Sequence, residues 1–310
     1  MSGQTLTLPA FAKINLGLRV VGKRTDGYHE IDTVFQTISL HDTITLTVTT
    51  NPEIALSSDD RSLPTGAGNL VYRAAEVLRA RHAPNKGVRI RLAKRIPVQA
   101  GLGGGSSDAA VTLLALANLW QIDVTPRELL EAASSLGSDV PFFLCGGAAR
   151  GSGTGKDLTP LPDAPDKFLL VVKPNANVST GAAYESLNAR TLTSTKAKTI
   201  LSSSHESEIS DRFDSEALQN DFEHSVFGLE PEIKRAKVAL VSAGAAAALL
   251  AGSGSAVFGI FDSGDAQSRV IRGLALESGW RVFPCSTVGR SHYRSAMGPC
   301  GVVLERFIGP

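Results

Sequence analysis

A glycine-rich segment is the strongest candidate for chemistry in this sequence. Residues 97–110 read PVQAGLGGGSSDAA, and four of the five residues from Gly101 to Gly105 are glycine. Backbone N–H groups of such a loop can converge on an anion, because no side chains stand in the way. The apolar helix expected directly after the loop adds the positive end of its dipole at the same point. We therefore favour a phosphate-binding loop, with hydroxyls from Ser106 and Ser107, over a flexible connector.

Neither common phosphate-loop signature describes this segment. It lacks the lysine of a Walker A motif, and no strand with an acidic residue follows at the distance of a dinucleotide-binding fold. Residues 151–157 (GSGTGKD) resemble a Walker A motif, but Arg150 and Asp157 occupy positions that require glycine and Ser or Thr. We interpret this stretch as a turn. A third glycine cluster, Gly252–Gly254, lies between two apolar runs and by itself favours a hairpin turn.

Three further groups place reactive side chains beside apolar sequence. Lys13 and Asn15 share one face of an expected strand, which indicates either a site or a solvent-facing side. Asp139 stands directly before the apolar run VPFF, where a desolvated carboxylate could act as a base or could cap the preceding helix. Tyr28 and His29 lie in a turn that could stack on a base and hydrogen-bond it, although a surface turn is favoured on this fact alone.

The elements that must position these residues form an α+β pattern. Apolar patterns predict strands over 14–21, 33–40, 43–49 and 88–93, with a turn near Asp42 between the second and the third, and a continuous apolar run predicts a buried strand over 168–172. Helices are expected from an N-cap at Asn69, over about 106–120, and from a capping box at Thr125, with a strand–helix–strand series from Val257. We place two lobes at residues 1–155 and 156–310. The Ser/Thr-rich segment 188–210 and the tail 286–310 receive no assignment.

Composition narrows the class of protein. The 310 residues carry 31 Lys and Arg against 30 Asp and Glu, so there is no basic excess for nucleic-acid binding. Three cysteines without a Cys-x-x-Cys pair argue against a disulfide scaffold or a zinc site. The N-terminus lacks a signal-peptide pattern, and the longest apolar stretches fall short of the roughly 20 residues that span a bilayer. We therefore expect a cytoplasmic protein with no membrane or nucleic-acid partner.

Taken together, these motifs resemble those of the GHMP small-molecule kinases. The segment from Pro97 to Ser107 is similar to the second motif of that family, Gly252–Gly254 to its third, and the run around Lys13 and Asn15 to its first. The likeness spans about residues 8 to 262. It implies a two-lobed GHMP kinase fold, with a ribosomal-protein-S5-like N-terminal lobe and a ferredoxin-like C-terminal lobe. The substrate is expected between the lobes.

The resemblance also implies an activity. The turn DGYHE at 26–30 and the run GSDVP at 137–141 resemble a branch of the family that transfers the ATP γ-phosphoryl group to the 2-hydroxyl of a cytidylyl-linked methylerythritol. That step belongs to non-mevalonate isoprenoid precursor biosynthesis. Mg²⁺ is expected with ATP, held mainly by phosphates and waters. The implied partner is this small molecule, and the implied assembly is a monomer or weak homodimer.

Site roles follow from the resemblance residue by residue. Asp139 would be the catalytic base and Lys13 its electrostatic partner, while Asn15 would contact the polyol. The resemblance places His29 on the cytosine edge, with Tyr28 and Tyr184 stacking on the base. It assigns substrate contacts also to Gly252, Ser253 and Gly254. Nucleotide contacts would come from Asn69, Lys94, Pro97, Gly101, Leu102, Gly103, Gly104, Gly105, Ser106 and Ser107.

Two departures and two alternatives stay open at this point. Ala251 stands where many family members have Ser or Thr, and Asp108 brings a negative charge near the phosphate loop with no assigned role. Another GHMP kinase, of the homoserine or mevalonate type, would share the nucleotide loop but not the base-reading turn. A non-catalytic nucleotide-binding protein of the same fold would need neither Lys13 nor Asp139.

Overall fold

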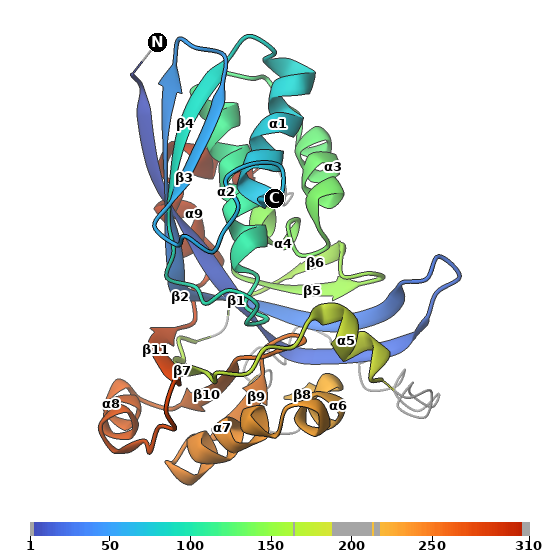
Figure 1. Ribbon diagram of the computed structural model, residues 1–310, viewed down its shortest axis with the longest axis vertical. Coiled ribbons are helices and arrows are strands. Elements are labelled where there is room, and N and C mark those ends of the chain that lie inside the picture. Colours follow the sequence, from blue (N-terminus) through green and yellow to red (C-terminus); the bar gives the residue numbers. More distant parts are fainter. Residues whose placement is uncertain (1–2, 164, 188–212, 214–217, 306–310) are drawn as a thin grey trace.

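The computed structural model describes residues 3–163, 165–187, 213 and 218–305. Within these residues the chain forms two sheets, one of seven strands and one of four, stacked as an upper and a lower lobe in Figure 1. The expected α+β class is therefore confirmed. The segment 188–210, to which the sequence gives no role, lies outside the described residues.

The larger sheet belongs mainly to the N-terminal half of the chain. Its central strands follow the order β3-β4-β2-β1-β8, and β5 pairs with both β2 and β6. Its strands are β1 (Thr5–Lys23), β2 (His29–Thr49), β3 (Ile54–Ser58), β4 (Gly87–Ala93), β5 (Ala148–Ser152), β6 (Asp157–Leu161) and β8 (Gln219–Asn220). The helices beside it are α1 (Leu70–His82), α2 (Gly104–Leu119), α3 (Pro126–Leu136) and α4 (Phe142–Cys145).

The first two strands are longer than the sequence predicted. β1 and β2 form one antiparallel hairpin that projects beyond the body of the protein in Figure 1. The turn expected near Asp42 is wrong, because Asp42 lies inside β2 and is fully buried. A register shift opposite Phe11 and Ala12 marks the irregularity instead. The strand continues there because the Asp42 carboxylate accepts backbone hydrogen bonds from the neighbouring segment after β4, so no reversal is needed.

The smaller sheet has the order β11-β7-β10-β9, and all its pairs are antiparallel. With the strands numbered along the chain this is the 4-1-3-2 order of a ferredoxin-like lobe, as expected. Its strands are β7 (Phe168–Lys173), β9 (Ala247–Leu250), β10 (Val257–Phe261) and β11 (Arg281–Ser286). The helices of this half are α5 (Thr180–Glu185), α6 (Phe222–Leu229), α7 (Pro231–Ser242) and α8 (Gly264–Gly273).

An apolar core joins the two lobes. Ile14, Leu16 and Ile38 from the larger sheet pack in one cluster with Val171 and Phe258 from the smaller one. Burial of such a cluster is the main stabilising term in folding and association. The two lobes therefore hold a defined relative position, which any site between them requires.

The tail that the sequence left unassigned returns to the N-terminal lobe. It forms α9 (Arg290–Ala296), the 3₁₀ turn η3 (Gly298–Cys300) and α10 (Gly301–Glu305). Tyr293 is fully buried there, and its hydroxyl donates to the carbonyl oxygen of Phe143 at 2.6 Å. Cys300 packs in the same core. The tail thus supports α4, while the residues after Glu305 lie outside the described part.

Local signals in the sequence placed most helices well. Asn69 caps α1 with its side chain, and Thr125 and Glu128 form the capping box of α3 with Pro126 at the first helical position. α2 begins at Gly104, two residues before the expected start at Ser106. Among the described residues, no helix combines the length and apolar character that crossing a membrane demands. The lobe division at residue 155 stays a prediction.

Candidate active site

A cleft of about 520 Å³ lies where the two lobes meet. Ligand pockets of a few hundred cubic ångströms are typical for small substrates. Its walls come from β1, the start of α2 and the turn before α4 in the larger lobe, and from α5 and the β9–β10 turn in the smaller one. Segments far apart in the sequence therefore converge on one space.

Lys13 and Asp139 form an ion pair in this cleft. The Lys13 Nζ lies 3.3 Å from an Asp139 carboxylate oxygen and donates to Asn15 Oδ1 at 2.8 Å. Lys13 and Asn15 are almost fully buried, whereas the Asp139 side chain is 32% exposed. The alternative of a solvent-facing strand side is therefore wrong for these two residues. A fixed ammonium beside an accessible carboxylate can orient that carboxylate towards a hydroxyl group and stabilise negative charge.

The turn that carries Asp139 is anchored by burial on its far side. α3 ends at Leu136, and the chain passes through Asp139 directly to Val140 and Phe142, which are completely buried. The Lys13 ammonium also lies 5.4 Å from the centre of the Phe35 ring, a favourable cation–π distance. Asp139 does not cap α3, because the C-cap position is Gly137. Apolar packing thus holds a polar pair at the cleft wall.

The glycine-rich loop passes beside Lys13 and opens α2. The Lys13 N–H donates to the Leu102 carbonyl at 3.0 Å, which joins the loop to β1. Gly103 has a φ of +70°, and a Cβ there would lie 3.0 Å from Lys13 Cγ. A side chain at that position would therefore compete with the lysine for space. The first N–H groups of α2 have no partners inside the helix, so they remain available to an anion in the cleft.

The third glycine cluster is both a hairpin turn and part of the cleft. β9 and β10 pair up to Leu250 and Val257, and the turn between them brings Gly252 and Ser253 to the cleft wall. The Ser253 hydroxyl lies 3.2 Å from that of Thr180 at the start of α5. A Cβ on Gly252 would lie 3.3 Å from Lys13 Nζ, so this turn and the ion pair are neighbours.

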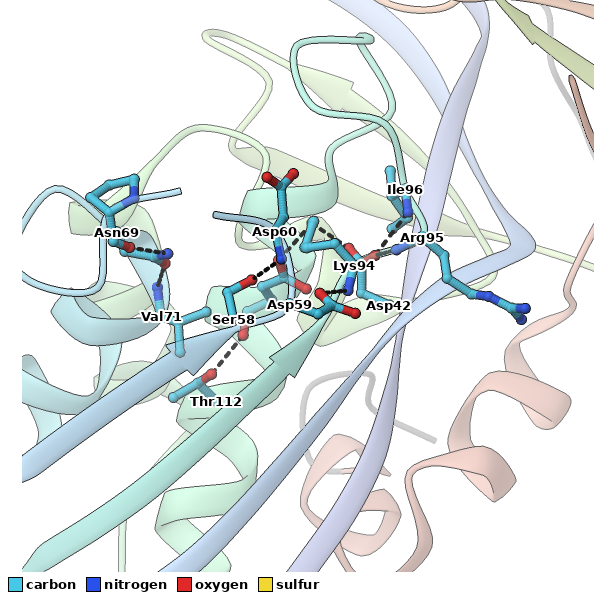
Figure 2. Close-up of polar contacts among 12 residues, drawn as sticks. Asp42, Ser58, Asp59, Asp60, Asn69, Val71, Lys94, Arg95, Ile96 and Thr112 are labelled. Atoms are coloured by element: carbon cyan, nitrogen blue, oxygen red, sulfur yellow. Dashed lines mark hydrogen bonds and ion pairs between the residues drawn. The ribbon is translucent and has the colours of Figure 1, made fainter. Parts of the chain in front are cut away.

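Asn69 and Lys94 both line the cleft, and each is already engaged in hydrogen bonds within the protein (Figure 2). The Asn69 amide accepts from Val71 N and donates to the Pro64 carbonyl, both at 2.9 Å. Lys94 lies between two buried carboxylates: it donates to Asp42 and, at 2.9 Å, to Asp108. Burial lowers the pKa of Lys94, but the two carboxylates raise it more, so it lies above its usual value.

The buried cluster explains Asp108, for which the sequence had no role. Its carboxylate does not cap α2. It forms an ion pair with Lys94, which connects the first turns of α2 to the residue that follows β4. Burial raises the pKa of Asp108 to about 7, partly offset by Lys94 and raised further by the charge of Asp42. The cost of burying a second carboxylate beside one lysine is the physical cause.

Asp108→Asn should make stability less dependent on pH. An unfolded aspartate titrates near pH 4, so between about pH 4 and about pH 7 the folded wild type binds more protons than its unfolded chain. Stability of the wild type therefore falls as pH rises through this window, whereas the substituted protein lacks the effect. Chemical denaturation at several pH values should show the variant gaining relative stability up to about pH 7 and no further. A difference that is constant across this range would contradict the assignment.

Two of the residues expected to read a base lie at the turn end of the long hairpin, and the third lies on α5. The His29 ring stacks on Tyr184 of α5, with ring centres 4.6 Å apart, and Tyr184 meets Phe222 edge-on. Burial and the nearby charge of Lys23 lower the pKa of His29, so its imidazole is neutral near pH 7. Tyr28 lies in the hairpin turn and is 67% exposed. The structure therefore brings two of these three rings together, and the stacking role of Tyr28 stays a prediction.

Most residues singled out in the sequence line the cleft. Ser107, Tyr28, His29 and Gly254 do not form part of its wall; Ser107 is fully buried, and its hydroxyl has no partner among the described residues. The residues at the wall are Lys13, Asn15, Asn69, Lys94, Pro97, Gly101, Leu102, Gly103, Gly104, Gly105, Ser106, Asp139, Tyr184, Gly252 and Ser253.

Comparison with known proteins identifies the family. The sequence models of "GHMP kinases N terminal domain" and "GHMP kinases C terminal" match residues 69–147 and 205–278. The 4-diphosphocytidyl-2-C-methyl-D-erythritol kinase of Lachnoclostridium phytofermentans is 42% identical over 85% of this chain and 90% of its own. The chain belongs to the GHMP kinase family. The enzyme of the same name from Solibacter usitatus is 43% identical over 93% of this chain and 90% of its own.

Solved structures of GHMP kinases share the fold. A crystal structure of a 4-(cytidine 5'-diphospho)-2C-methyl-D-erythritol kinase superposes with a TM-score of 0.77 at 34% identity, covering 92% of this chain and all of that one. The homoserine kinase from Cytophaga hutchinsonii superposes with a TM-score of 0.70 at 17% identity over 93% and 96%, which shows the fold alone. The chain is therefore a small-molecule kinase of the ATP-dependent GHMP family, as the motifs indicated.

Sequence reasoning missed two residues that support the candidate site through hydrogen bonds. Thr33 is buried, accepts from the Asn15 amide at 2.7 Å and donates to the Gly17 carbonyl. Thr180 holds Ser253, as described above. No local pattern distinguishes them, because Thr33 is one of many threonines in β2 and only the register of β1 on β2 places it near Asn15. A sequence pattern shows which residues share one face of a helix or strand, whereas these contacts depend on how separate elements pair in the folded protein.

Proposed function

We propose that this GHMP kinase transfers the γ-phosphoryl group of ATP to the 2-hydroxyl of 4-diphosphocytidyl-2-C-methyl-D-erythritol, with Asp139 as the base. The observation that carries the proposal is the Lys13–Asp139 pair at 3.3 Å, set in a cleft between two glycine loops. The names of the relatives at about 40% identity support the choice of substrate. The proposed setting is non-mevalonate isoprenoid precursor biosynthesis in the cytoplasm.

The ion pair supplies the acid–base part of the reaction. The Asp139 carboxylate would take the proton of the 2-hydroxyl as its oxygen attacks the γ-phosphorus, and the bond to the β-phosphate oxygen breaks. Lys13 would keep the carboxylate in place and offset charge on the transferred group. Asn15, fixed between Lys13 and Thr33, would orient the polyol. Phosphoryl transfer depends mainly on positioning and electrostatics, so these few groups are sufficient.

The phosphates of ATP would lie against the glycine loop and the start of α2. Gly103 leaves no room for a Cβ beside Phe143 and Lys13, and the N–H groups that follow it at the start of α2 would bind the phosphates. The described residues contain no cluster of three or more His, Cys, Asp or Glu side chains that could hold a metal ion by itself. Mg²⁺ would therefore be bound mainly by the phosphates and waters, where it neutralises phosphate charge.

The other end of the substrate would meet the aromatic side of the cleft. Tyr184 is positioned by Phe222 and His29, so it offers a fixed ring for a base to stack on. The neutral imidazole of His29 has one donor and one acceptor nitrogen, which suits the mixed edge of cytosine. Homoserine and mevalonate contain no base, so this aromatic side of the cleft favours the cytidylyl compound as the acceptor substrate.

An ADP-release assay with the purified protein tests the proposal directly. Turnover with the cytidylyl-methylerythritol substrate should exceed turnover with homoserine or mevalonate by orders of magnitude. Preference for homoserine or mevalonate would replace the proposed substrate while keeping the kinase. Nucleotide binding without turnover of any substrate would instead favour the non-catalytic alternative.

His29→Ala should weaken recognition of the cytosine base. We expect the KM for the cytidylyl substrate to rise about tenfold or more, because a buried polar edge of the base loses its partner. The KM for ATP should stay within a factor of about two, since the nucleotide loop is on the other side of the cleft. His292→Ala, which alters an exposed histidine of α9, is the matched control. Equal changes in both KM values would remove His29 from base recognition.

A further inference from the structure

Asn220 is a buried amide outside the catalytic pair and outside the motifs that the sequence revealed. It is the last residue of β8, a two-residue strand that comes from the C-terminal half of the chain. β8 nevertheless pairs in parallel with β1 of the larger sheet, with Leu18 opposite Asn220. Asn220 is 6% exposed. It therefore sits at a junction between the two halves, and its partner Leu18 lies three residues along β1 from Asn15.

The Asn220 side chain makes three hydrogen bonds, and all three are to backbone groups. Its NH₂ group donates to the Leu250 carbonyl at 2.9 Å and to the Gly252 carbonyl at 2.7 Å. Its Oδ1 accepts from the Phe222 N–H at 3.0 Å. Glu223 adds a bond to the Leu250 N–H at 2.9 Å. The β8–α6 junction thus holds both the last residue of β9 and the turn that follows it.

The turn held in this way faces the catalytic lysine and the phosphate loop. A Cβ on Gly252 would lie 3.3 Å from Lys13 Nζ and 2.9 Å from the Gly101 carbonyl oxygen. Gly252 has a φ of +54°, in the left-handed region, so its carbonyl group points in a different direction from that of a residue in a regular strand. Both donors of a single amide bind the carbonyls on either side of Ala251. Loss of that amide would free the turn next to the reacting groups.

We propose that Asn220 is a positioning residue that fixes the turn at Gly252 and Ser253 against Lys13, so that the turn meets the substrate in one conformation. Asn220 itself touches neither substrate nor Lys13; it acts through the two carbonyls. The kinetic part of this inference rests on the proposed function, because it concerns the transfer to the cytidylyl substrate. The structural part, control of the turn, stands by itself.

Asn220→Asp is the sharpest variant. It keeps the size of the side chain and the acceptor for Phe222, but it replaces the two donors by a carboxylate oxygen that faces carbonyl oxygens. Gln267→Glu is a matched control in the C-terminal half of the chain. Gln267 is also buried, and its NH₂ group also bridges two carbonyls, those of Leu169 and Cys285, away from the cleft. Both variants therefore replace an amide by a carboxylate that faces backbone carbonyls, but only Asn220→Asp does so next to the candidate active site.

The two variants should separate positioning from general stability. We expect kcat with the cytidylyl substrate to fall at least about tenfold in Asn220→Asp, with the KM for ATP changed less than about threefold. Gln267→Glu should keep kcat near the wild-type value even where it lowers the melting temperature. Hydrogen exchange measured by mass spectrometry should be faster over residues 250–256 in Asn220→Asp and unchanged there in Gln267→Glu.

The outcomes distinguish this inference from the proposed function. Equal losses of kcat in both variants, or unchanged exchange over 250–256 in Asn220→Asp, would overturn the role of Asn220. A wild type without activity on the cytidylyl substrate would overturn the proposed function alone. In that case the exchange measurement still decides whether Asn220 holds the turn.

Discussion

Asp139→Asn should reduce kcat by about 10² to 10⁴ while nucleotide binding is kept. The amide is nearly the same size as the carboxylate, so the turn anchored by Val140 and Phe142 should hold its shape. The change removes the carboxylate proposed to take the hydroxyl proton and leaves Lys13 without its anionic partner. Rate measurements by ADP release, together with titration of a non-hydrolysable ATP analogue, check both halves of the prediction.

A second lysine–aspartate pair provides the control for Asp139. Lys167 and Asp262 lie 3.7 Å apart on the surface, and the Asp262 side chain is 81% exposed. Exposed pairs of this kind contribute little to stability, and Asp262 does not line the cleft. Asp262→Asn should therefore leave kcat unchanged. If Asp139→Asn turned over near the wild-type rate, another group would have to accept the proton.

Local signals predicted those parts of the fold that local physics controls. The N-cap Asn69, the capping box at Thr125 and the glycine-rich start of α2 each act within a few residues. The turn predicted at Asp42 is wrong, because an aspartate between two apolar runs usually indicates a turn but here lies inside β2. Its hydrogen-bond partners, Lys94, Arg95 and Ile96, lie more than fifty positions further along the chain. A partner at that separation cannot be read from neighbouring residues.

The site shows the same division between local and distant information. Alternation in β1 placed Lys13 and Asn15 on one face, and an isolated acid before an apolar run drew attention to Asp139. The approach of Lys13 to Asp139, at 3.3 Å, depends on packing between β1 and the turn after α3. Asn220 follows no sequence pattern, and the role proposed for it depends on its hydrogen bonds to Leu250 and Gly252, thirty or more positions further along the chain. The residues expected to contact substrate therefore leave clearer signals in the sequence than the residue proposed to position them.

The structure adds an internal role to Lys94, which the resemblance assigned to nucleotide binding. Lys94 was expected as a contact of the adenosine, and it does lie at the cleft wall. Two of its three ammonium donors are engaged by Asp42 and Asp108, so one remains for a ligand. Charge at this wall is thus largely compensated within the protein. In the proposed function, binding of the ATP phosphates would then depend more on backbone N–H groups than on Lys94.

Gly101→Ala should disable the enzyme although the substitution adds a single methyl group. Gly101 has a φ of +77°, and a Cβ there would lie 1.9 Å from the Ala251 carbonyl oxygen. Relief of this clash requires that the glycine-rich loop and the turn at Gly252 move apart. A displacement of about 1 Å between such groups can cost about a hundredfold in rate, so kcat/KM for ATP should fall by at least that factor.

A second glycine separates this collision from backbone strain. Gly244, just after α7, has a φ of +103°, but a Cβ there would meet nothing within 4 Å. Gly244→Ala should therefore cost only about 1 kcal/mol of stability, the ordinary penalty for a left-handed alanine, and leave kcat/KM intact. Melting curves and steady-state rates of both variants make the comparison. Similar kinetics for the two would mean that the contact between the loops is dispensable, and that the glycine at 101 serves only its own backbone conformation.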